Sequence, residues 1–376
     1  MQALLVLLFA AVTQASLAPF YRVEPNIPGQ YIVVLEDGVD VGRFAASIKT
    51  GTVRKTLTGI LNAVVLTLDN NLLDIVRGLN GVRYIEEDGL ATVLGSRNPS
   101  QYWGLDRIGQ RNMPLDGSIN FSGTGSGANV FIIDTGIRHN HEDFGARAEF
   151  FHDYQEKVGE DCNGHGTHCA GTAGGTYSGV AVGTNLFSVR VMSCLGSGSY
   201  SNIIDGVNAV AASSKPNKVA SMSIGGGVST ALNEAVEGAI SGGKVVVVVA
   251  AGNDNADACN YSPASAGNAI TVGATRASVD GNSDLRSSFS NYGTCVDIFA
   301  PGSSISSASY SSDTSYTSMS GTSMACPHVA GAAAIIRGDA SSLTPSLVTA
   351  RLLNDASSNK ITSPGTGSPN LLLYVE

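Results

Sequence analysis

From Trp103 onward, strand-like and helix-like segments alternate along the chain, and this pattern most limits the folds that it can adopt. Unbroken β-rich runs, typical of strands buried on both faces, occur at residues 130–133, 186–191, 220–224 and 244–249. Helix-like segments occupy residues 165–174, 200–212 and 230–241. This alternation predicts an α/β fold with a doubly wound, mostly parallel sheet. Ligands of such sheets bind at the carboxyl ends of the strands, so catalytic residues are expected there.

The N-terminal part of the chain has a different pattern. Strand-like segments lie at residues 28–35, 59–68 and 82–88, and helix-like segments at 41–49 and 72–79. A β-α-β-β-α-β order over this stretch predicts a small α+β, ferredoxin-like module. The polar residues 95–101 that follow are typical of an exposed linker, where proteolysis is easy.

Residues Met1–Ala15 form an apolar run that is too short to span a bilayer and ends in small residues. The run predicts a secretory signal peptide and therefore an extracellular protein; the alternative is a buried N-terminal helix. No other stretch approaches the ~18 uninterrupted apolar residues of a membrane span, so no membrane association is expected.

Composition excludes one further class of partner. The formal net charge is −9 and Lys and Arg form no cluster, which argues against nucleic-acid binding. Secretion would permit disulfides among the six cysteines, but their number alone leaves the connectivity open. Because no C-x-x-C pair occurs, a structural zinc site is not expected.

Ser323 lies where a stretch of small residues, Gly321–His328, runs into an apolar segment of helical composition at 329–336. A serine at a helix N-terminus meets free backbone N–H groups and the positive end of the helix dipole. If Pro327 falls in the first turn, it removes a donor that would have no partner there. The serine is either a helix cap or a nucleophile.

Three distant residues could complete a catalytic site around Ser323. Asp134 directly follows the strand at 130–133, where it could orient an imidazole or merely form a turn. His165 begins a helix within a glycine-flanked segment, where it could act as a base. Asn253 follows the strand at 244–249, where its amide could donate to an oxyanion or form an Asx turn.

Two alternative chemistries fit the sequence poorly. His165 and His168 share a helix face, but the zinc motif H-E-x-x-H needs spacing four and a glutamate, and both are missing. A lipase or esterase would need G-x-S-x-G around its serine, which is absent at Ser323. The order Asp134, His165, Ser323 is also that of subtilisin rather than of chymotrypsin.

The segments Asp134–Gly136, Asn163–His168 and Gly321–His328 resemble the three signature motifs of the subtilases. Residues 250–257 and 261–265 are similar to the proteinase K branch of that family. The resemblance covers residues 101–376, and residues 28–94 resemble the family's inhibitory propeptide. It implies a signal peptide at 1–15, a propeptide at 16–95 and a subtilisin-like peptidase domain at 96–376.

The resemblance also implies a role for each candidate. His165 would be the general base, Asp134 its orienting acid and Ser323 the nucleophile. The Ser323 N–H and the Asn253 amide would form the oxyanion hole. The chain would be a secreted, monomeric serine endopeptidase that works through an acyl-enzyme without a catalytic cofactor. Its propeptide would be cut near residues 94–97 and inhibit until degraded. The alternative, an inactive subtilase-fold binding protein, would need a lesion in the triad, and the sequence has none.

Substrate-binding residues follow from the same resemblance. Two edge strands would bind an extended peptide between them, at Gly196, Ser197, Gly198, Ser199 and Tyr200 and at Ser223, Ile224, Gly225 and Gly226. The S1 pocket would have walls at Ala250, Ala251 and Gly252 and its far end at Tyr261. These segments have small and apolar walls and contain no carboxylate that could hold a basic P1 side chain. The prediction is therefore broad specificity with apolar or aromatic P1 residues, not a dibasic one.

The resemblance finally implies disulfides and bound calcium. The aqualysin-like relatives pair cysteines at positions matching Cys162 with Cys194 and Cys259 with Cys295, which leaves Cys169 and Cys326 free. A structural calcium ion would bind Asp297 and the carbonyls of Gly267 and Ala269. A second site would comprise Asp106, Gln110, Asp116 and Ser118, although Gly109 stands where relatives have an aspartate.

Overall fold

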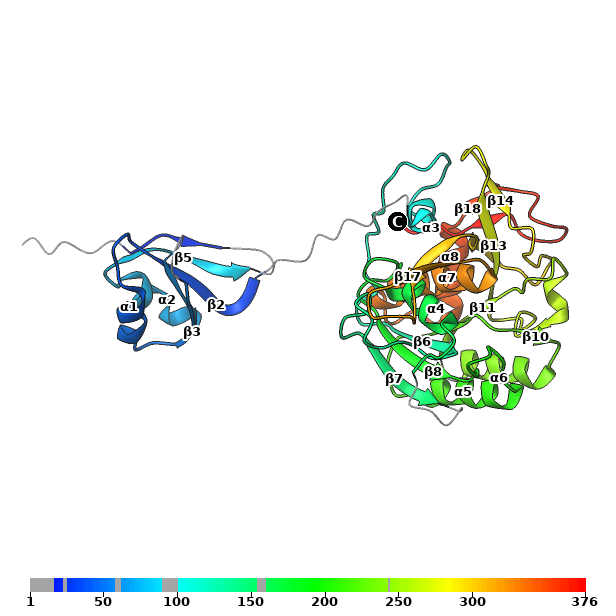
Figure 1. Cartoon of the computed structure of the whole chain (residues 1–376), viewed down its shortest axis with the longest axis horizontal. Helices are drawn as coiled ribbons and strands as arrows, with labels where there is room; N and C mark the ends of the chain where they lie inside the picture. The colour runs from blue at the N-terminus through cyan, green and yellow to red at the C-terminus, as the bar shows by residue number, and fades with distance from the viewer. Residues whose placement is uncertain (1–16, 23–25, 58–61, 90–100, 154–159, 243) are drawn as a thin grey trace, which may run out of the picture. The chain divides into compact units, whose positions relative to one another are not determined.

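The computed structural model describes residues 17–22, 26–57, 62–89, 101–153, 160–242 and 244–376. The chain divides into two compact units, residues 1–94 and 95–376 (Figure 1). The predicted signal peptide and the predicted cleavage region at 94–97 lie outside the described residues. Within the described ranges, no helix has both the length and the apolar composition that crossing a membrane requires.

The smaller unit is built on one sheet with strand order β1-β5-β2-β4-β3. Its elements are β1 (Phe20–Tyr21), β2 (Asn26–Leu35), α1 (Val41–Ser47), β3 (Thr52–Leu57), β4 (Ala63–Thr67), η1 (Asn70–Leu72), α2 (Leu73–Arg77) and β5 (Val82–Gly89). From β2 to β5 the elements follow a β-α-β-β-α-β order, but β3 lies outside the predicted strand ranges and the strand expected at 59–68 is shorter. Val33, Leu66 and Ile85 of the sheet share one buried cluster with Phe44 of α1 and Val76 of α2.

The larger unit contains the predicted alternation of strands and helices. Its first half comprises α3 (Trp103–Ile108), β6 (Asn129–Asp134), β7 (Ala148–Asp153), α4 (His165–Gly174), β8 (Asn185–Arg190), α5 (Tyr200–Ala212), β9 (Lys218–Met222), β10 (Gly226–Gly227), α6 (Thr230–Ser241) and β11 (Val246–Ala250). Its second half comprises η2 (Ala258–Asn260), β12 (Tyr261–Ser262), β13 (Ile270–Ala277), β14 (Asp284–Arg286), β15 (Ile298–Pro301), β16 (Ile305–Ala308), β17 (Tyr316–Met319), α7 (Thr322–Asp339), α8 (Pro345–Asp355), β18 (Ser357–Ser358), β19 (Ile361–Thr362) and β20 (Leu371–Leu372).

The main sheet has the order β18-β20-β15-β13-β11-β9-β6-β8-β7. All pairs from β7 to β15 are parallel, whereas β14 pairs antiparallel with β13 and β18 pairs antiparallel with β20. Because β6 lies between β8 and β9, the strand order reverses there, which is where α/β sheets form a ligand crevice. The prediction of a mostly parallel α/β sheet is confirmed, and Asp134, the last residue of β6, lies at the reversal point.

Helices cover both faces of the sheet (Figure 1). Val130 and Ile132 of β6 pack in the cluster that includes α4 and α7, whereas Phe131 and Ile133 pack in the cluster that includes α5 and α6. Alternate side chains of β6 thus pack against the helices on opposite faces of the sheet, which explains why the strand is an unbroken apolar run. At Gly331 of α7, a Cβ atom would lie 2.6 Å from the carbonyl oxygen of Ala173. This glycine lets α7 approach α4 closely.

Two disulfide bonds, Cys162–Cys194 and Cys259–Cys295, close stretches with sequence separations of 32 and 36 residues. In the chain-entropy account, loops of this length stabilise a fold by roughly 3–4 kcal/mol each. Cys169 and Cys326 are free and buried.

Candidate active site

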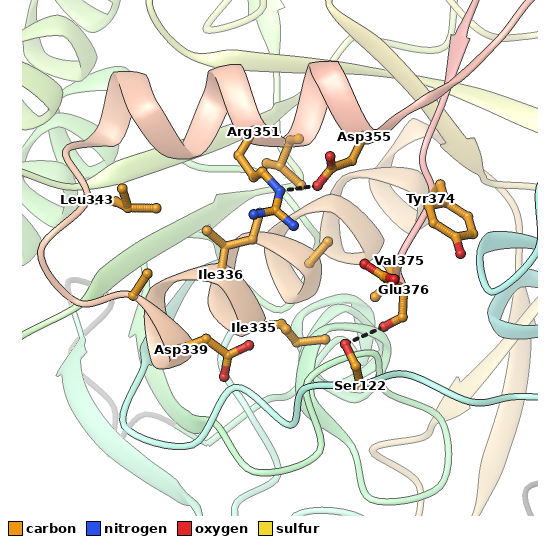
Figure 2. A pocket seen from close by; sticks show the side chains of 13 residues that line it. Ser122, Ile335, Ile336, Asp339, Leu343, Arg351, Asp355, Tyr374, Val375 and Glu376 are labelled. Atoms are coloured by element: carbon orange, nitrogen blue, oxygen red, sulfur yellow. Dashed lines mark hydrogen bonds and ion pairs between the residues drawn. The ribbon is translucent and has the colours of Figure 1, made fainter.

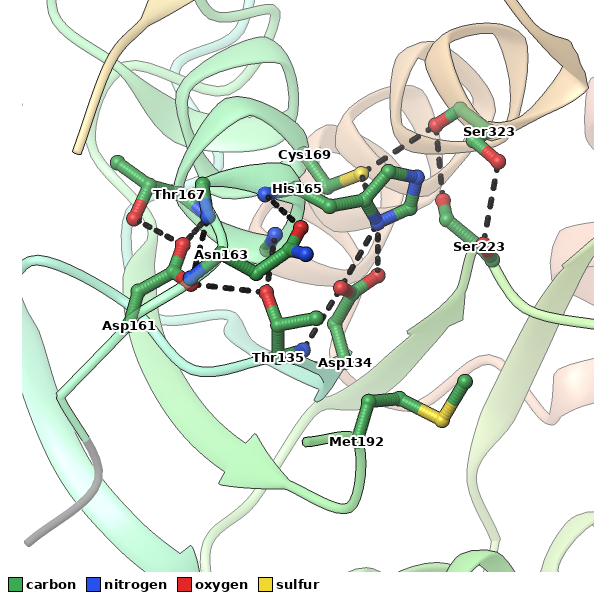
Figure 3. Close-up of polar contacts among 12 residues, drawn as sticks. Asp134, Thr135, Asp161, Asn163, His165, Thr167, Cys169, Met192, Ser223 and Ser323 are labelled. Carbon is green, nitrogen blue, oxygen red and sulfur yellow. Dashed lines mark hydrogen bonds and ion pairs between the residues drawn. The ribbon is translucent and has the colours of Figure 1, made fainter. Parts of the chain in front are cut away.

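Asp134 and His165 form a buried hydrogen-bonded pair at the carboxyl end of β6. Nδ1 of His165 lies 2.8 Å from Oδ1 and 2.9 Å from Oδ2 of Asp134, as Figure 3 shows. The carboxylate is fully buried, whereas the His165 side chain is 29% exposed. Thr135 N–H also donates to Asp134 Oδ1, at 2.7 Å. The carboxylate therefore fixes the tautomer of His165 and leaves Nε2 free to act as a base.

The glycines around His165 are needed for this approach. A Cβ atom at Gly166 would lie 2.2 Å from the carbonyl oxygen of Gly136, in the turn that follows Asp134. Gly164 has φ +106°, and a Cβ atom there would meet the ring of Tyr310 at 2.5 Å. Both positions exclude larger residues, so the first turn of α4 lies directly against the end of β6.

Ser323 is the second residue of α7, and Gly321 is the residue that caps this helix. Its Oγ donates to the carbonyl oxygen of Ser223, at 3.1 Å (Figure 3). Among the described residues, no hydrogen bond joins Ser323 Oγ to His165. The two residues meet around Cys169, whose Sγ lies 3.9 Å from His165 Nδ1 and 3.4 Å from the Ser323 carbonyl oxygen.

Pro327 does not fall in the first turn of its helix, so the role considered for it there does not apply. Because α7 begins at Thr322, Pro327 is its sixth residue and lies beyond the first turn. Its missing N–H deprives the carbonyl of Ser323, four residues earlier, of its helical partner. Ser223 Oγ donates to that carbonyl instead, at 2.8 Å. Ser223 and Ser323 thus exchange two hydrogen bonds, which ties the start of α7 to the end of β9.

Asn253 is oriented by Thr322. Its Oδ1 accepts hydrogen bonds from Thr322 N at 2.8 Å and from Thr322 Oγ1 at 2.9 Å. The amide oxygen is therefore occupied, and Nδ2 is left as a free donor. A Cβ atom at Gly321 would lie 3.5 Å from Ser323 N and 3.6 Å from Asn253 Nδ2. Two N–H groups therefore flank Gly321, as an oxyanion hole requires.

A cavity of about 340 Å³ adjoins these donors. It brings together predicted residues from the segment after β9, the end of β11 and the segment after it, β12 and α7, namely Ser223, Ile224, Gly225, Ala250, Ala251, Gly252, Asn253, Tyr261 and Ser323. Gly226 of the predicted edge segment also lines it, as do Gly227, Ser262 and Ala264, which were not predicted. Its size and its position beside Ser323 suit one substrate side chain.

The prediction that only small and apolar residues line this pocket was wrong, because a carboxylate from outside the segments considered also reaches it. Asp254 lines the same cavity, and its carboxylate accepts a hydrogen bond from the hydroxyl of Tyr261. The residue follows Asn253 directly, but only the bend of the chain after β11 directs it into the pocket.

Gly196, Ser197, Gly198 and Tyr200 do not line this cavity. Tyr200 instead donates from its Oη to the carbonyl of Gly227, at 2.8 Å, and so connects the two predicted substrate-binding segments. Residues 196–199 and 223–225 are irregular, not the edge strands that were expected. A strand needs a neighbouring strand to pair with, and among the described residues neither segment pairs with one.

Burial and charge set the protonation of the site. Burial by itself lowers the pKa of His165, but the Asp134 carboxylate and the Cys169 sulfur together raise it by more, so the net pKa lies well above the ordinary value of 6.5. Burial raises the pKa of the Cys169 thiol, which therefore remains neutral beside the histidine. Burial lowers the pKa of His168 and of His328 to about 4 each, which keeps both uncharged.

The geometry disfavours a metal at the histidines. Nε2 of His168 lies 2.9 Å from the carbonyl oxygen of Ile305 and is therefore taken up by that hydrogen bond. In the described part of the chain, Asp134, His165 and Cys169 are the one group of three side chains close enough to share an ion. Two of them already form the hydrogen-bonded pair, and the third is a neutral thiol.

A separate cavity of about 130 Å³ lies between α7, α8 and the C-terminal residues (Figure 2). The Arg351–Asp355 ion pair lines it, and Ser122 Oγ donates to the carbonyl of Glu376 there, at 2.8 Å. It contains none of the predicted catalytic or substrate-binding residues, so the chemistry belongs to the cavity at Ser323.

This arrangement suits acyl transfer. Ser323 and His165 both contact Cys169, a buried carboxylate orients the imidazole, and two N–H donors flank the adjoining space. The fold and the site define a serine hydrolase of the Asp-His-Ser type.

Comparisons with known proteins specify the class further. The profile of the subtilase family matches residues 125–370. An extracellular serine proteinase of Thermus sp. (strain Rt41A) is 45% identical over 97% of this chain and 94% of its own length. Alkaline serine exoprotease A of Vibrio alginolyticus is 47% identical over 84% of this chain and 58% of its own length. The crystal structure of a cold adapted subtilisin-like serine proteinase matches with a TM-score of 0.70 and 50% identity, over 75% of this chain and 99% of that one.

The chain belongs to the subtilase family. It is a secreted subtilisin-like serine endopeptidase, and enzymes of this family need no catalytic cofactor. The alternative of an inactive subtilase-fold binding protein is not supported.

Sequence reasoning missed one polar residue beside the catalytic pair. Asp161 is buried, and its carboxylate accepts five hydrogen bonds from residues around Asp134 and His165. No local motif marks this residue, because its bond partner Thr135 is 26 positions away.

Proposed function

We propose that Asp134, His165, Ser323 and Asn253 hydrolyse peptide bonds in this enzyme. Ser323 Oγ attacks the scissile carbonyl while Nε2 of His165 takes its proton, and His165 then passes that proton to the leaving amine. A water molecule then attacks the acyl carbonyl while His165 takes its proton. His165 passes that proton to Ser323 Oγ as the acid product leaves. The observation that carries the proposal is the contact of both Asp134 carboxylate oxygens with His165 Nδ1.

Before attack, the Ser323 hydroxyl must turn from the Ser223 carbonyl toward His165. Catalytic hydrogen bonds in substrate-free enzymes are often not yet formed and tighten when substrate binds. The oxyanion then accepts hydrogen bonds from Ser323 N–H and Asn253 Nδ2. The two bonds from Thr322 to Asn253 Oδ1 support this orientation of the amide.

The substrate is an extended peptide that adds as a strand between residues 196–200 and 223–226. Residues 196–199 and 223–225 pair with no strand in the described part of the chain, which supports this mode. The carbonyls of Ser197, Ser199 and Ser223 already accept hydrogen bonds from Ser193 N–H, Ile203 N–H and Ser323 Oγ, so the peptide would pair with the remaining backbone groups. We infer broad specificity with a preference for apolar or aromatic P1 side chains. Asp254, at the Tyr261 end of the cavity, also allows a long basic P1 side chain to be accepted there.

The smaller unit would be the propeptide of a self-processing zymogen, and the mature enzyme would be a monomer. The division of the chain near residues 94 and 95 supports a removable N-terminal module. Cleavage in the linker would release a peptidase domain that has its own core and both disulfides.

Calcium would stabilise the mature domain. Burial raises the pKa of Asp297 to about 6, and its carboxylate accepts one backbone hydrogen bond, from Thr271 N–H at 2.8 Å. A buried carboxylate whose negative charge is balanced by only one backbone hydrogen bond suits Ca²⁺ as a ligand. The same ion would also bind the carbonyls of Gly267 and Ala269.

A second ion would fit Asp106 and its neighbours. Asp106 Oδ1 is buried with no hydrogen-bond partner, and burial and the nearby Asp116 both raise the pKa of Asp106. Gln110 Oε1 accepts from Asp116 N–H and Ser118 N–H donates to Asp116, so these residues enclose a small acidic loop. Such a loop suits a hard cation even with Gly109 in place of an aspartate.

Replacing Ser323 by Ala tests the catalytic assignment. The variant should leave the precursor uncut and should not hydrolyse a peptide anilide with an apolar P1 residue. A serine-directed covalent inhibitor should label the wild-type enzyme at Ser323 and should not label the variant. An efficiently matured, active Ser323→Ala protein would refute the assignment.

A further inference from the structure

Asp161 is the most heavily hydrogen-bonded side chain near the catalytic pair. Its Oδ1 accepts from Thr135 Oγ1 at 2.9 Å, Asn163 N at 2.9 Å and Gly164 N at 2.8 Å. Its Oδ2 accepts from Thr167 N at 2.9 Å and Thr167 Oγ1 at 2.6 Å. The residue is only 8% exposed, so these five donors take the place of water around the carboxylate.

The five donors come from two separate parts of the chain (Figure 3). Thr135 directly follows Asp134 at the end of β6, whereas Asn163, Gly164 and Thr167 flank His165 at the start of α4. Thr135 Oγ1 also accepts from Gly166 N–H, at 2.9 Å. One carboxylate therefore connects the neighbours of the catalytic acid to the neighbours of the catalytic base.

A helix cap alone does not explain this pattern. Gly164 caps α4 without a side-chain hydrogen bond, so the free N–H groups of the first turn need an acceptor from elsewhere. Asp161 meets that need at Thr167, and its charge suits the positive end of the helix. The bond from Thr135 caps no helix. Its effect is to fix the end of β6 against α4.

The segment that carries Asp161 is itself restrained. Cys162 is disulfide-bonded to Cys194, and NH1 of Arg190 donates to the carbonyl of Glu160 at 3.1 Å. Both neighbours of Asp161 are thus tied to the end of β8 or to the segment that follows it. The carboxylate is held from its own backbone as well as by its five donors.

We propose that Asp161 is a positioning residue, whose carboxylate sets the distance and angle between Asp134 and His165 during catalysis. The inference rests on the catalytic roles proposed above for these two residues. Asp161 does not line the cavity at Ser323, so it acts through the catalytic pair and not on substrate binding.

Replacing Asp161 by Asn keeps the size of the side chain but turns one acceptor oxygen into an NH₂ group that faces donors. A misplacement of about 1 Å in an active site costs about 10²-fold, so we expect kcat to fall by about that factor while KM stays within about twofold. The low-field proton resonance of His165 Nδ1–H should shift or broaden, because it reports the Asp134–His165 hydrogen bond directly.

A second pair of variants keeps the test valid if Asp161→Asn does not mature. Thr135→Val removes only the hydroxyl that joins Asp161 to Gly166 N–H, and we expect about a tenfold loss of kcat, the value of about one hydrogen bond. Thr135→Ser keeps that hydroxyl and should restore both kcat and the resonance.

Asp143→Asn is the matched control, since Asp143 is a buried carboxylate that accepts bonds from Tyr177 N and Ser178 Oγ and contacts neither catalytic residue. It should lower thermal stability and leave kcat per folded molecule and the resonance unchanged. If Asp161→Asn and Thr135→Val behave like this control, the positioning role is wrong and Asp161 is only structural. Wild-type hydrolysis by His165→Ala would instead overturn the proposed function.

Discussion

Replacing Asn253 by Asp separates the oxyanion donor from the structural role of the same side chain. The two hydrogen bonds from Thr322 end on Oδ1 of Asn253, at 2.8 and 2.9 Å. An aspartate keeps an oxygen at that position and can accept both bonds. Only Nδ2, the atom facing Gly321, changes from a donor to an acceptor.

The expected magnitude follows from the loss of that donor. Removing one oxyanion-hole donor in a subtilisin costs about 10²–10³-fold in kcat, or about 2.7–4 kcal/mol. We expect at least this loss for Asn253→Asp, because the new oxygen also repels the developing negative charge. KM should change little, since the donor matters most in the transition state. Asn253→Ala should lose a similar factor in kcat but also stability, because Thr322 N–H and Oγ1 lose their acceptor, at about 1–3 kcal/mol for each buried unsatisfied group.

Steady-state hydrolysis of a peptide anilide, with folded enzyme measured by circular dichroism, gives kcat and KM for both variants. Thermal unfolding gives their stabilities. If Asn253→Asp keeps kcat within threefold of wild type, Nδ2 is not an oxyanion donor. Equal losses of stability in the two variants would show that the Thr322 bonds do not hold the amide in place.

Three further outcomes are expected. His165 must be neutral to act as a base, and its pKa lies well above 6.5. We therefore expect kcat/KM to be low in acid and to rise with an apparent pKa above 6.5. A pH profile that rises below pH 6 would contradict this. Burial raises the pKa of Asp297 from 3.8 to about 6, so without calcium the ionisation of Asp297 destabilises the fold as pH rises through that range. In the presence of a chelator at pH 7, Asp297→Asn should therefore stabilise the protein by up to about 3 kcal/mol. The same variant should abolish the rise in Tm that calcium causes in the wild type. Gly321→Ala should fold normally, because the φ of 161° at this residue is extended backbone. It should have a lower kcat, because its methyl group would lie 3.5 Å from Ser323 N and 3.6 Å from Asn253 Nδ2, the two oxyanion donors. An unchanged kcat would show that the oxyanion binds elsewhere.

Much of the fold could be predicted from periodicity. The helices at 200–212 and 230–241 have the predicted bounds, because each is a continuous amphipathic segment with a serine N-cap. Strands β7 and β13 were not predicted, for different reasons. β7 is a partly exposed edge strand with charged residues, and β13 contains Gly273, which usually weakens a strand. There, a Cβ atom would lie 2.4 Å from the Phe299 ring, so the glycine is required by packing that no local pattern reveals.

The candidate site could be predicted only where a residue ends a strand or begins a helix. Asp134, His165 and Asn253 follow or start regular elements, so their types and positions were informative. Asp254 and Asp161 lie in loops, and their roles depend on where the chain turns next. Asp161 reaches Thr135 across 26 residues, a contact that no reading of the neighbouring sequence contains.

Pro327 shows how a residue without functional groups can determine the geometry of the site. In an uninterrupted helix, the Ser323 carbonyl would accept from the N–H four residues later, and Ser223 Oγ would need another partner. Since Pro327 has no N–H, that carbonyl is left to accept from Ser223 Oγ, while Ser323 Oγ donates to the Ser223 carbonyl. The proline thus links the nucleophile to β9, the strand that leads into residues 223–225 of the cavity. The nucleophile is held on a rigid strand end and not only on the first turn of its helix.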